Sequence, residues 1–314
     1  MEYSGLIQKY KINRPLMKEE HSLQLRQKQK LDVAPHYAFT VIKLNSTYME
    51  LADKYYGWRG FLTQGMSLVI LVCAYGIGGF IYSHIATWEK FYDQHFERTI
   101  FVLIASAVLL GLLLVAVWGL RKEAFHLTHF PIRLNRKTRM VHLFRPDRSG
   151  TILSVPWDDV FFTLSRGQVL GHWDIRGHVL DVDKVTVKES FALGMPWADK
   201  EVLLRNWEFM RRYMEDGPQG IIDFIPLYWP IATKREPWIV GLQRLLLTVS
   251  GSVVGHTILL PFFVLFSFGR VIANHTSSIP VWPAEIEATC PIEPGDHFER
   301  DERNNVVNRI GWLV

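Results

Sequence analysis

Cysteine is scarce in this sequence: among 314 residues only Cys73 and Cys290 occur, far apart along the chain. Two thiols cannot by themselves form a disulfide framework or a metal site. We therefore expect no metal, no redox chemistry and no bound cofactor.

Catalytic signatures are also lacking. The chain has no phosphate-binding loop, no G-x-S-x-G elbow and no dinucleotide fingerprint. The glycine-rich residues 75–80 lie inside an apolar run, where we expect Gly76 and Gly79 to let a neighbouring helix approach closely. These absences predict a non-enzymatic protein.

A cleavable signal peptide is not predicted, because residues 1–59 are polar and lack a short apolar core followed by small residues. What the sequence does contain is three uncharged runs, residues 60–88, 99–120 and 245–269. Each is long enough to cross a hydrocarbon core, which takes about 20 helical residues. We expect an integral membrane protein; the alternative for the first two runs is a buried helical pair in a soluble domain.

Basic residues flank the first two runs. Ten Lys or Arg precede the first run, others follow the second, and the connecting segment 86–99 has more acidic than basic residues. Since Lys and Arg favour the cytoplasmic side, we expect residues 60–120 to form two transmembrane helices with an acidic external loop. The N-terminal segment 1–59 and the central residues 121–237 would then be cytoplasmic.

The third run leaves two alternatives open. Residues 238–270 either span the membrane, which places an extended C-terminal arm 271–314 outside, or re-enter it as a helix kinked at Pro261. Gly251 and Gly255 are four residues apart, as on a close-packing helix face. His256 lies at mid-membrane depth, either as a functional residue or, more commonly, as a hydrogen-bond partner of a neighbouring helix.

The central segment 121–237 changes to a period of two, with turn residues between short apolar stretches. One amphipathic helix follows at residues 196–214, and its Trp207 and Met210 should fill the core. Residues 36–44 have strand composition and can add a strand from before the first run. The fold expected is a membrane α-helical hairpin plus an α+β soluble domain, in which antiparallel strands are closed by one helix. A third helix is membrane-inserted or re-entrant.

Residues 133–145, RLNRKTRMVHLFR, contain five basic residues and no acidic one. Arg133, Arg136, Lys137 and Arg139 are candidate contacts for anionic lipid, because each cation near such a leaflet contributes about 1 kcal/mol. The alternative is a solvated turn whose charge only sets the topology. No aromatic platform accompanies the charges, so we do not expect nucleic-acid binding.

Histidine and aspartate pairs are the remaining candidates for chemistry. His126 and His129 have helical spacing near the predicted membrane surface, but no carboxylate or thiol completes a metal site. His172 and His178 flank a predicted hairpin without a nucleophile nearby. Asp158 and Asp159 would face opposite sides of a strand, and Trp157 before them should pack in the core.

Both ends of the chain look irregular. Residues 18–32 alternate charges and amides without an apolar face, which predicts a solvated or loosely ordered segment. The last residues hold several prolines and end in the apolar IGWLV, which we expect to dock on the protein itself or on a partner.

The stretch NRKTR followed by VPWDDV, residues 155–160, resembles the opening of bacterial pleckstrin-homology-like domains attached to paired membrane spans. The whole layout is similar to a family of uncharacterised proteobacterial inner-membrane proteins encoded beside type VI secretion effector genes. The resemblance implies location in the bacterial inner membrane and an accessory or immunity role toward a secreted effector or its loading machinery.

The leading hypothesis is therefore a non-enzymatic, membrane-anchored interaction protein with a protein partner. The alternative is an anionic-lipid sensor or a subunit of a small transport assembly, in which Arg136, Lys137 and Arg139 touch lipid. A membrane-embedded enzyme that uses His256, His126 or His129 is a third and weaker hypothesis.

Overall fold

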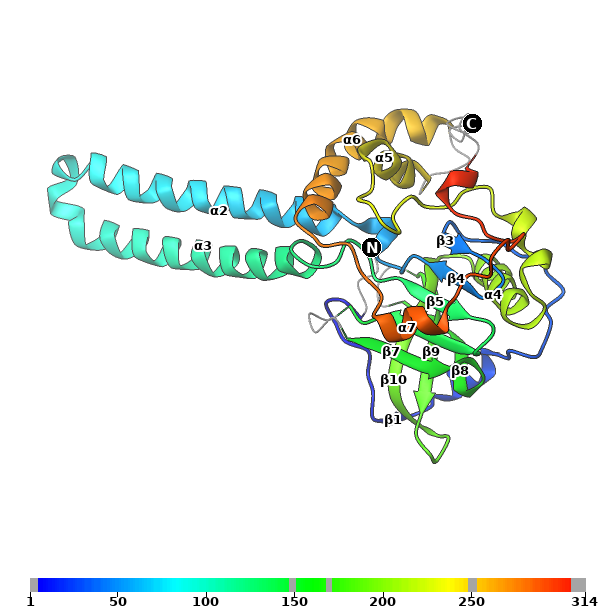
Figure 1. Ribbon diagram of the computed structural model, residues 1–314. Helices are drawn as coiled ribbons and strands as arrows, with labels where there is room; N and C mark the ends of the chain where they lie inside the picture. The colour runs from blue at the N-terminus through cyan, green and yellow to red at the C-terminus, as the bar shows by residue number, and fades with distance from the viewer. Residues whose placement is uncertain (1–4, 147–150, 168–170, 248–252, 306–314) are drawn as a thin grey trace.

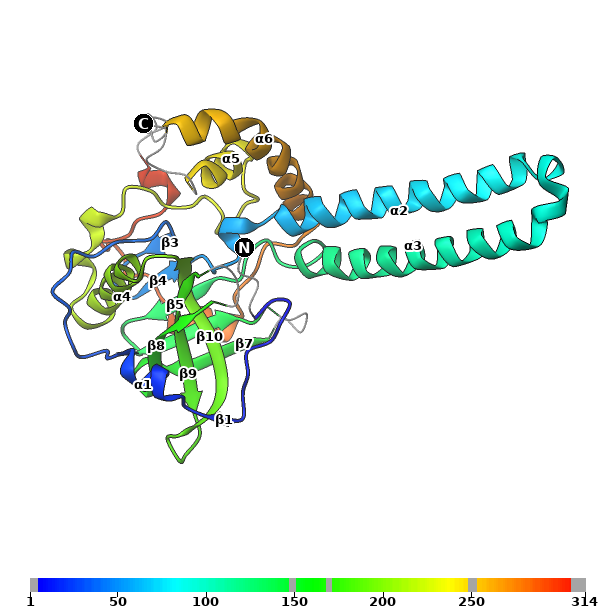
Figure 2. The ribbon, with the colours of Figure 1, turned by 180° about the vertical axis from the view of Figure 1, so that it is seen from behind.

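A long helical hairpin and a body that contains two antiparallel sheets are the main parts of the chain in Figure 1. The computed structural model describes residues 5–146, 151–167, 171–247 and 253–305. The hairpin projects from one end of the body in both views (Figures 1 and 2). The predicted mixed α+β fold with antiparallel strands is confirmed.

The first sheet is an antiparallel meander in the order β3-β4-β5-β6-β7. Its strands are β3 (Val41–Leu44), β4 (Tyr48–Leu51), β5 (Ile132–Asn135), β6 (Met140–Phe144) and β7 (Ile152–Pro156). The hairpin is inserted between β4 and β5, which pair with Leu51 opposite Ile132. The chain therefore leaves and re-enters this sheet at the same end.

The second sheet has the order β1-β10-β9-β8-β2. Its strands are β1 (Arg14–Pro15), β2 (Gln24–Leu25), β8 (Val160–Arg166), β9 (Trp173–Leu180) and β10 (Thr186–Trp197). The short 3-10 helix η3 (Trp157–Asp159) joins β7 to β8. Asp158 and Asp159 thus lie in a helical turn rather than on a strand, because the chain must pass there from one sheet to the other.

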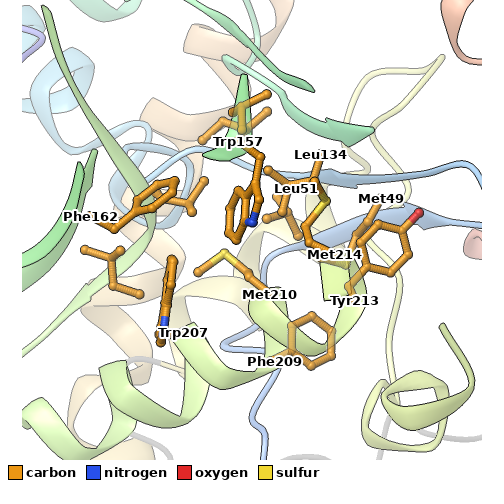
Figure 3. Close-up of a cluster of buried hydrophobic side chains, with 14 of the residues drawn as sticks. Met49, Leu51, Leu134, Trp157, Phe162, Trp207, Phe209, Met210, Tyr213 and Met214 are labelled. Carbon is orange, nitrogen blue, oxygen red and sulfur yellow. The ribbon is translucent and has the colours of Figure 1, made fainter. Parts of the chain in front are cut away.

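The core is closed by α4 (Lys200–Glu215), which begins where the Asp199 side chain accepts a hydrogen bond from the Glu201 amide. Trp207 from this helix stacks on Trp157 with ring centres 5.4 Å apart, and Phe162 lies 4.8 Å from both rings (Figure 3). Met210 lies in the same buried cluster. The single amphipathic helix expected at residues 196–214 is α4, and it packs as predicted.

The hairpin consists of α2 (Phe61–Ala86) and α3 (His95–Glu123), joined by η2 (Glu89–Gln94) and preceded by η1 (Tyr56–Trp58). The two long helices lie side by side (Figure 1). A Cβ atom on Gly76 would come within 2.8 Å of Leu109 Cδ1, whereas one on Gly79 would meet nothing within 4 Å. Gly76 therefore lies at the helix contact and Gly79 does not.

The third apolar run is divided between two helices, α5 (Trp238–Leu246) and α6 (Val253–His275), and α6 contains Pro261. Gly251 lies outside the described residues, as does the C-terminal IGWLV, and the structure does not describe the side chain of His256. Gly255 lies in the first turn of α6. The predicted helix at 238–270 is thus interrupted, and α6 continues beyond it into the expected arm.

The arm after α6 is not simply extended. It contains α7 (Ala284–Thr289) and η7 (Glu302–Asn304), and the backbones of Arg300 and Leu44 hydrogen-bond to each other in both directions. Two further 3-10 turns, η4 (Pro218–Gly220) and η5 (Ile222–Phe224), follow α4.

The N-terminal segment is ordered, contrary to expectation. It contains α1 (Lys18–Ser22) and supplies β1 and β2 to the second sheet. Glu20 is only 2% exposed and accepts two hydrogen bonds from Arg14, while its carboxylate lies 3.1 Å from His178 Nε2. The prediction of a loosely ordered segment was wrong, because this part of the chain forms α1 and β2. Most of its charged side chains are exposed, as on a solvated segment, and Glu20 is the buried exception.

Candidate functional site

The surface of the hairpin is apolar along its length. Large hydrophobic side chains are exposed on both helices, among them Leu71, Tyr75 and Ile85 on α2 and Phe101, Leu103 and Val115 on α3. In the described chain three helices are long and apolar enough to cross a membrane: α2, α3 and residues 257–275 of α6. An exposed apolar surface of this extent marks an interaction with lipid or with another apolar surface.

Where the hairpin meets the sheets, the polar side chains are buried and paired with one another. Arg59, just before α2, donates to Asn274 Oδ1 at 2.9 Å and to Ser277 Oγ at 2.8 Å. Its guanidinium also donates to the backbone carbonyls of Glu123 and Ala273. One side chain therefore connects the start of α2, the end of α3 and the end of α6.

Glu123 at the end of α3 contacts the first turn of α2. Its carboxylate accepts hydrogen bonds from the backbone amide and the hydroxyl of Thr63, both at 2.6 Å. A buried carboxylate is tolerated only when such partners replace its hydration. This contact fixes the start of α2 against the end of α3.

Arg270 on α6 forms a buried ion pair in this region. It is only 1% exposed, donates to Glu236 through Nε (2.5 Å) and Nη2 (2.6 Å), and donates to the Tyr56 carbonyl at 2.8 Å. Gly60 has φ +95°, and a Cβ there would lie 2.3 Å from the Arg270 backbone nitrogen. We call the set Arg59, Gly60, Thr63, Glu123, Glu236, Arg270, Asn274 and Ser277 the junction.

Arg133, the first of the candidate lipid contacts, is buried. Only 2% of its side chain is exposed, and the guanidinium pairs with Glu50 at 2.8 Å and Glu287 at 3.1 Å. The rings of Tyr48 and Trp282 lie 4.2 and 4.5 Å from it. Because these groups already enclose the cation, we leave Arg133 out of any proposed lipid contact.

The other three candidates lie in the turn between β5 and β6. Since β5 begins at the hairpin end of the sheet and runs away from it, this turn lies at the opposite end. Lys137 pairs with Glu293, and Arg139 pairs with Asp158 at 2.5 Å and Glu215 at 2.7 Å. Arg136 approaches Gly217 from the same turn. The lipid-contact hypothesis for these residues stays a prediction, but acidic neighbours offset much of their charge.

Neutralising this turn should change lipid retention little. We expect the triple variant Arg136→Gln, Lys137→Gln, Arg139→Gln to retain co-purifying anionic lipid within about twofold of the parent, because attraction to an anionic leaflet falls off within a Debye length and this turn lies at the end of the sheet opposite the hairpin. The variant Arg121→Gln, Lys122→Gln at the end of α3 should lower it roughly fivefold or more, given about 1 kcal/mol for each cation near an anionic leaflet. Lipid mass spectrometry after mild detergent extraction measures both. The reverse ranking would make the turn the lipid contact.

The histidine pairs are separated by the fold. α3 ends before His126, so His126 and His129 do not share a helix; His129 is buried with Nδ1 3.1 Å from the Thr128 hydroxyl. His178 is buried on β9 beside Ser190 and Glu20, whereas His172 precedes that strand. Within the described residues no group of three or more His, Cys, Asp or Glu could hold a metal ion.

A cavity of about 210 Å³ lies between the first sheet, β10 and the N-terminal segment. Its wall also contains Lys54, whose ammonium pairs with the buried Asp174 at 3.1 Å. Asp174 in turn pairs with Arg176 at 2.9 Å. The apolar residues that line the cavity include Ile12, Phe130, Ile132, Leu143, Phe144 and Phe191.

These features define a class of protein: an α+β domain whose first sheet is interrupted by an apolar helical hairpin, with buried hydrogen bonds and the Arg270–Glu236 ion pair at the base of the hairpin. The chain belongs to a family of unknown function, DUF6708, whose model matches residues 109–294. The matched region begins inside α3 and contains β5 to β10 and α4 to α7. No curated protein and no solved structure matches the chain.

Proposed function

We propose that this chain is a membrane-anchored interaction protein. The α2–α3 hairpin crosses the bilayer, and the two sheets with the C-terminal arm present a binding surface on one side of it. The junction carries this proposal: at the base of a helical pair whose outer surface is apolar, it buries Arg59, Glu123 and Arg270 among polar partners. Such a joint holds the domain in a defined orientation relative to the bilayer.

A binding role rather than a catalytic one is supported by the structural contacts of the buried charged side chains. Arg59, Glu123 and Arg270 hold helices together, and Arg133 holds the C-terminal arm. By the distribution of Lys and Arg, the domain faces the cytoplasm and residues 87–94 face the other side.

An immunity or accessory role toward a type VI secretion effector, in a bacterial inner membrane, is the finer form of this proposal. It rests on the similarity of the whole layout to a family of inner-membrane proteins encoded beside type VI secretion effector genes. NRKTR and VPWDDV resemble the opening of pleckstrin-homology-like domains. The order of elements, two antiparallel sheets followed by α4, is compatible with a pleckstrin-homology-like domain.

A second candidate function, recognition of a small amphipathic ligand such as a lipid, has its best support in the cavity. The cavity combines an aromatic lining with Lys9 and Arg145, and residues 53–55 of its wall lead directly into η1 and the hairpin. This differs from the anionic-lipid site first expected at the basic turn.

Exposed apolar side chains of the domain suggest where a protein partner would bind. Val182 in the β9–β10 turn is 96% exposed and Val185 is 50% exposed, and Met17 is exposed beside them, since the Leu16 amide donates to the Val185 carbonyl. The β9–β10 hairpin projects from the body in Figures 1 and 2. Isolated exposed apolar residues are common, but a group at the tip of a projecting hairpin favours recognition.

The test is mild detergent extraction of the tagged chain from its own cells, followed by mass spectrometry of co-purifying polypeptides and lipids. We expect a stoichiometric polypeptide, reduced roughly tenfold or more by Val182→Asp, because a charge at the centre of an apolar contact must be desolvated. Thr138→Asp, which adds the same charge at another exposed turn, is the control. Recovery of lipid alone, with no polypeptide, would favour the ligand function instead.

A further inference from the structure

We infer that α6 does not cross the membrane but lies in the interfacial layer of the bilayer, on the same side as the sheets, with its apolar face in lipid. This inference rests on the proposed function in that it takes the α2–α3 hairpin to span the bilayer. The chain then has two spans, and its C-terminal arm lies on the side of the domain.

The chain that follows α6 is bound to the domain. Thr128 and Ser278 are joined by a backbone hydrogen bond of 2.8 Å, and the Trp282 indole donates to Glu50 at 3.0 Å. Farther along, Glu287 pairs with Arg133, and Arg300 bonds to Leu44 through the backbone. The end of α6 is therefore on the side of the first sheet.

The start of α6 must be on the same side. α5 packs on the domain, because Val240 lies against the cluster that contains Ile42 and Trp229, and Arg244 donates to Met195 Sδ of β10 at 3.3 Å. Only residues 247–252 separate α5 from α6, so Leu246 and Val253 can be at most about 25 Å apart. A hydrocarbon core is about 30 Å thick. A segment that starts and ends on one side cannot cross the membrane once.

Between its ends, α6 contacts the hairpin near the start of α2. Phe266 stacks on Phe61 with ring centres 4.3 Å apart, and a Cβ on Gly269 would lie 2.5 Å from the Gly60 carbonyl oxygen. From there α6 turns away from α2 and α3 and lies beside α5 over the body (Figures 1 and 2). A third spanning helix would instead run along the hairpin.

The two faces of α6 differ in polarity. Its inner face buries Phe263 against α5 and holds Ser267, Arg270 and Asn274 in hydrogen bonds. In the most apolar part of α6 a third of the residues are buried, whereas the buried share is 6% in the corresponding part of each hairpin helix. The outer face exposes Val254, Ile258, Leu260, Phe262, Leu265 and Phe268.

Lipid is the occupant that fits this outer face. The face is continuous with the apolar surface of the hairpin, because α6 crosses α2 at its first turn, and Trp238 and Ile239 of α5 extend it. Helices with one apolar face lie about 5–10 Å deep at the boundary between head groups and acyl chains, where Trp side chains are favoured.

The first experiment measures sidedness. In a chain with Cys73→Ala and Cys290→Ser, single cysteines at Lys90, Lys188 and Glu285 are labelled with a membrane-impermeant maleimide in vesicles of known orientation; all three positions are exposed. We expect Glu285→Cys and Lys188→Cys to react from one side and Lys90→Cys only from the other. If Glu285→Cys and Lys90→Cys react from one side and Lys188→Cys only from the other, the inference is overturned. Labelling of all three from one side would instead overturn the spanning hairpin.

A second experiment measures depth. An environment-sensitive fluorophore at Leu265→Cys on α6 should be quenched more strongly by a quencher placed near the lipid head groups than by one deep in the acyl chains. The same fluorophore at Leu110→Cys, near the middle of α3, is the matched control and should show the opposite order. If both positions report the same central depth, α6 is not interfacial.

Discussion

Replacing Arg270 with alanine should lower the free energy of unfolding by about 3–5 kcal/mol, as expected when one partner of a buried ion pair is removed. The substitution leaves the Glu236 carboxylate, itself 8% exposed, without the guanidinium that holds both of its oxygens. It also removes the donor to the Tyr56 and Arg59 carbonyls. Chemical unfolding in detergent, followed by tryptophan fluorescence, measures the loss.

Two further variants separate the loss of a buried partner from the loss of a positive charge. Arg303→Ala removes an arginine from an exposed ion pair and should leave stability unchanged within error. The double variant Arg270→Met, Glu236→Leu should recover about half or more of the loss, because no unpaired charge remains. If Arg270→Ala unfolds as the parent does, the junction does not hold α6 in place.

The elements that could be predicted from the sequence are those whose signal is local. An uncharged run of more than 20 residues can form only a few structures, so the ranges 60–88 and 99–120 lie close to the observed α2 and α3. The amphipathic helix predicted at residues 196–214, with Trp207 and Met210 in the core, likewise lies close to the observed α4, because one apolar face must pack on the sheets.

The parts that were missed depend on partners far away in the sequence. Glu20 pairs with His178, 158 residues later, and Arg133 pairs with Glu50 and Glu287 on either side of it. These contacts cannot be predicted from the residues of segments 18–32 and 133–145 alone. A basic stretch that looks like one surface therefore contains one buried structural arginine and a turn whose charges have acidic neighbours.

The two alternatives for the third apolar run also could not be decided from composition. Hydropathy does not distinguish a helix that crosses lipid from one that lies on the protein with one face in lipid. The decisive residues are outside the run: Trp282 and Arg300 bind the chain that follows α6 to the first sheet. Within the sequence, Arg270 indicated that this helix has a polar contact with the protein, because it is a charged residue near the end of an otherwise uncharged helix.

Acidification from about pH 7 to about pH 5 should destabilise the domain by about 4 kcal/mol through two buried histidines. Burial lowers the pKa of His129 to about 3 and that of His142 to about 4, and the charges of Arg59 and Arg133 act in the same direction. Both imidazoles therefore stay neutral in the folded chain at pH 5, whereas in the unfolded chain they take up protons near pH 6.5. Because the unfolded state binds more protons below pH 6.5, stability falls by about 2 kcal/mol for each residue.

Other buried groups modify this slope without reversing its expected sign. Burial also lowers the pKa of His178, against the effect of Glu20, so His178 adds to the loss. Burial raises the pKa of Asp53, which opposes the loss as that carboxyl takes up a proton. The lowered pKa of Asp174, whose burial is outweighed by Lys54 and Arg176, matters only below its ordinary value of 3.8.

Denaturant unfolding in detergent at several pH values between about 7 and about 5 measures the effect. The variant His129→Asn, His142→Asn, whose side chains do not titrate in this range, should lose the share of about 4 kcal/mol that these two residues contribute, although its stability at pH 7 will be lower than that of the parent. An unchanged slope in this variant would mean that other groups take up the protons. His129 lies between α3 and β5, in the segment that leads from the hairpin into the first sheet, whereas His142 lies within that sheet on β6. Acid should therefore destabilise both the attachment of the domain to its hairpin and the first sheet itself.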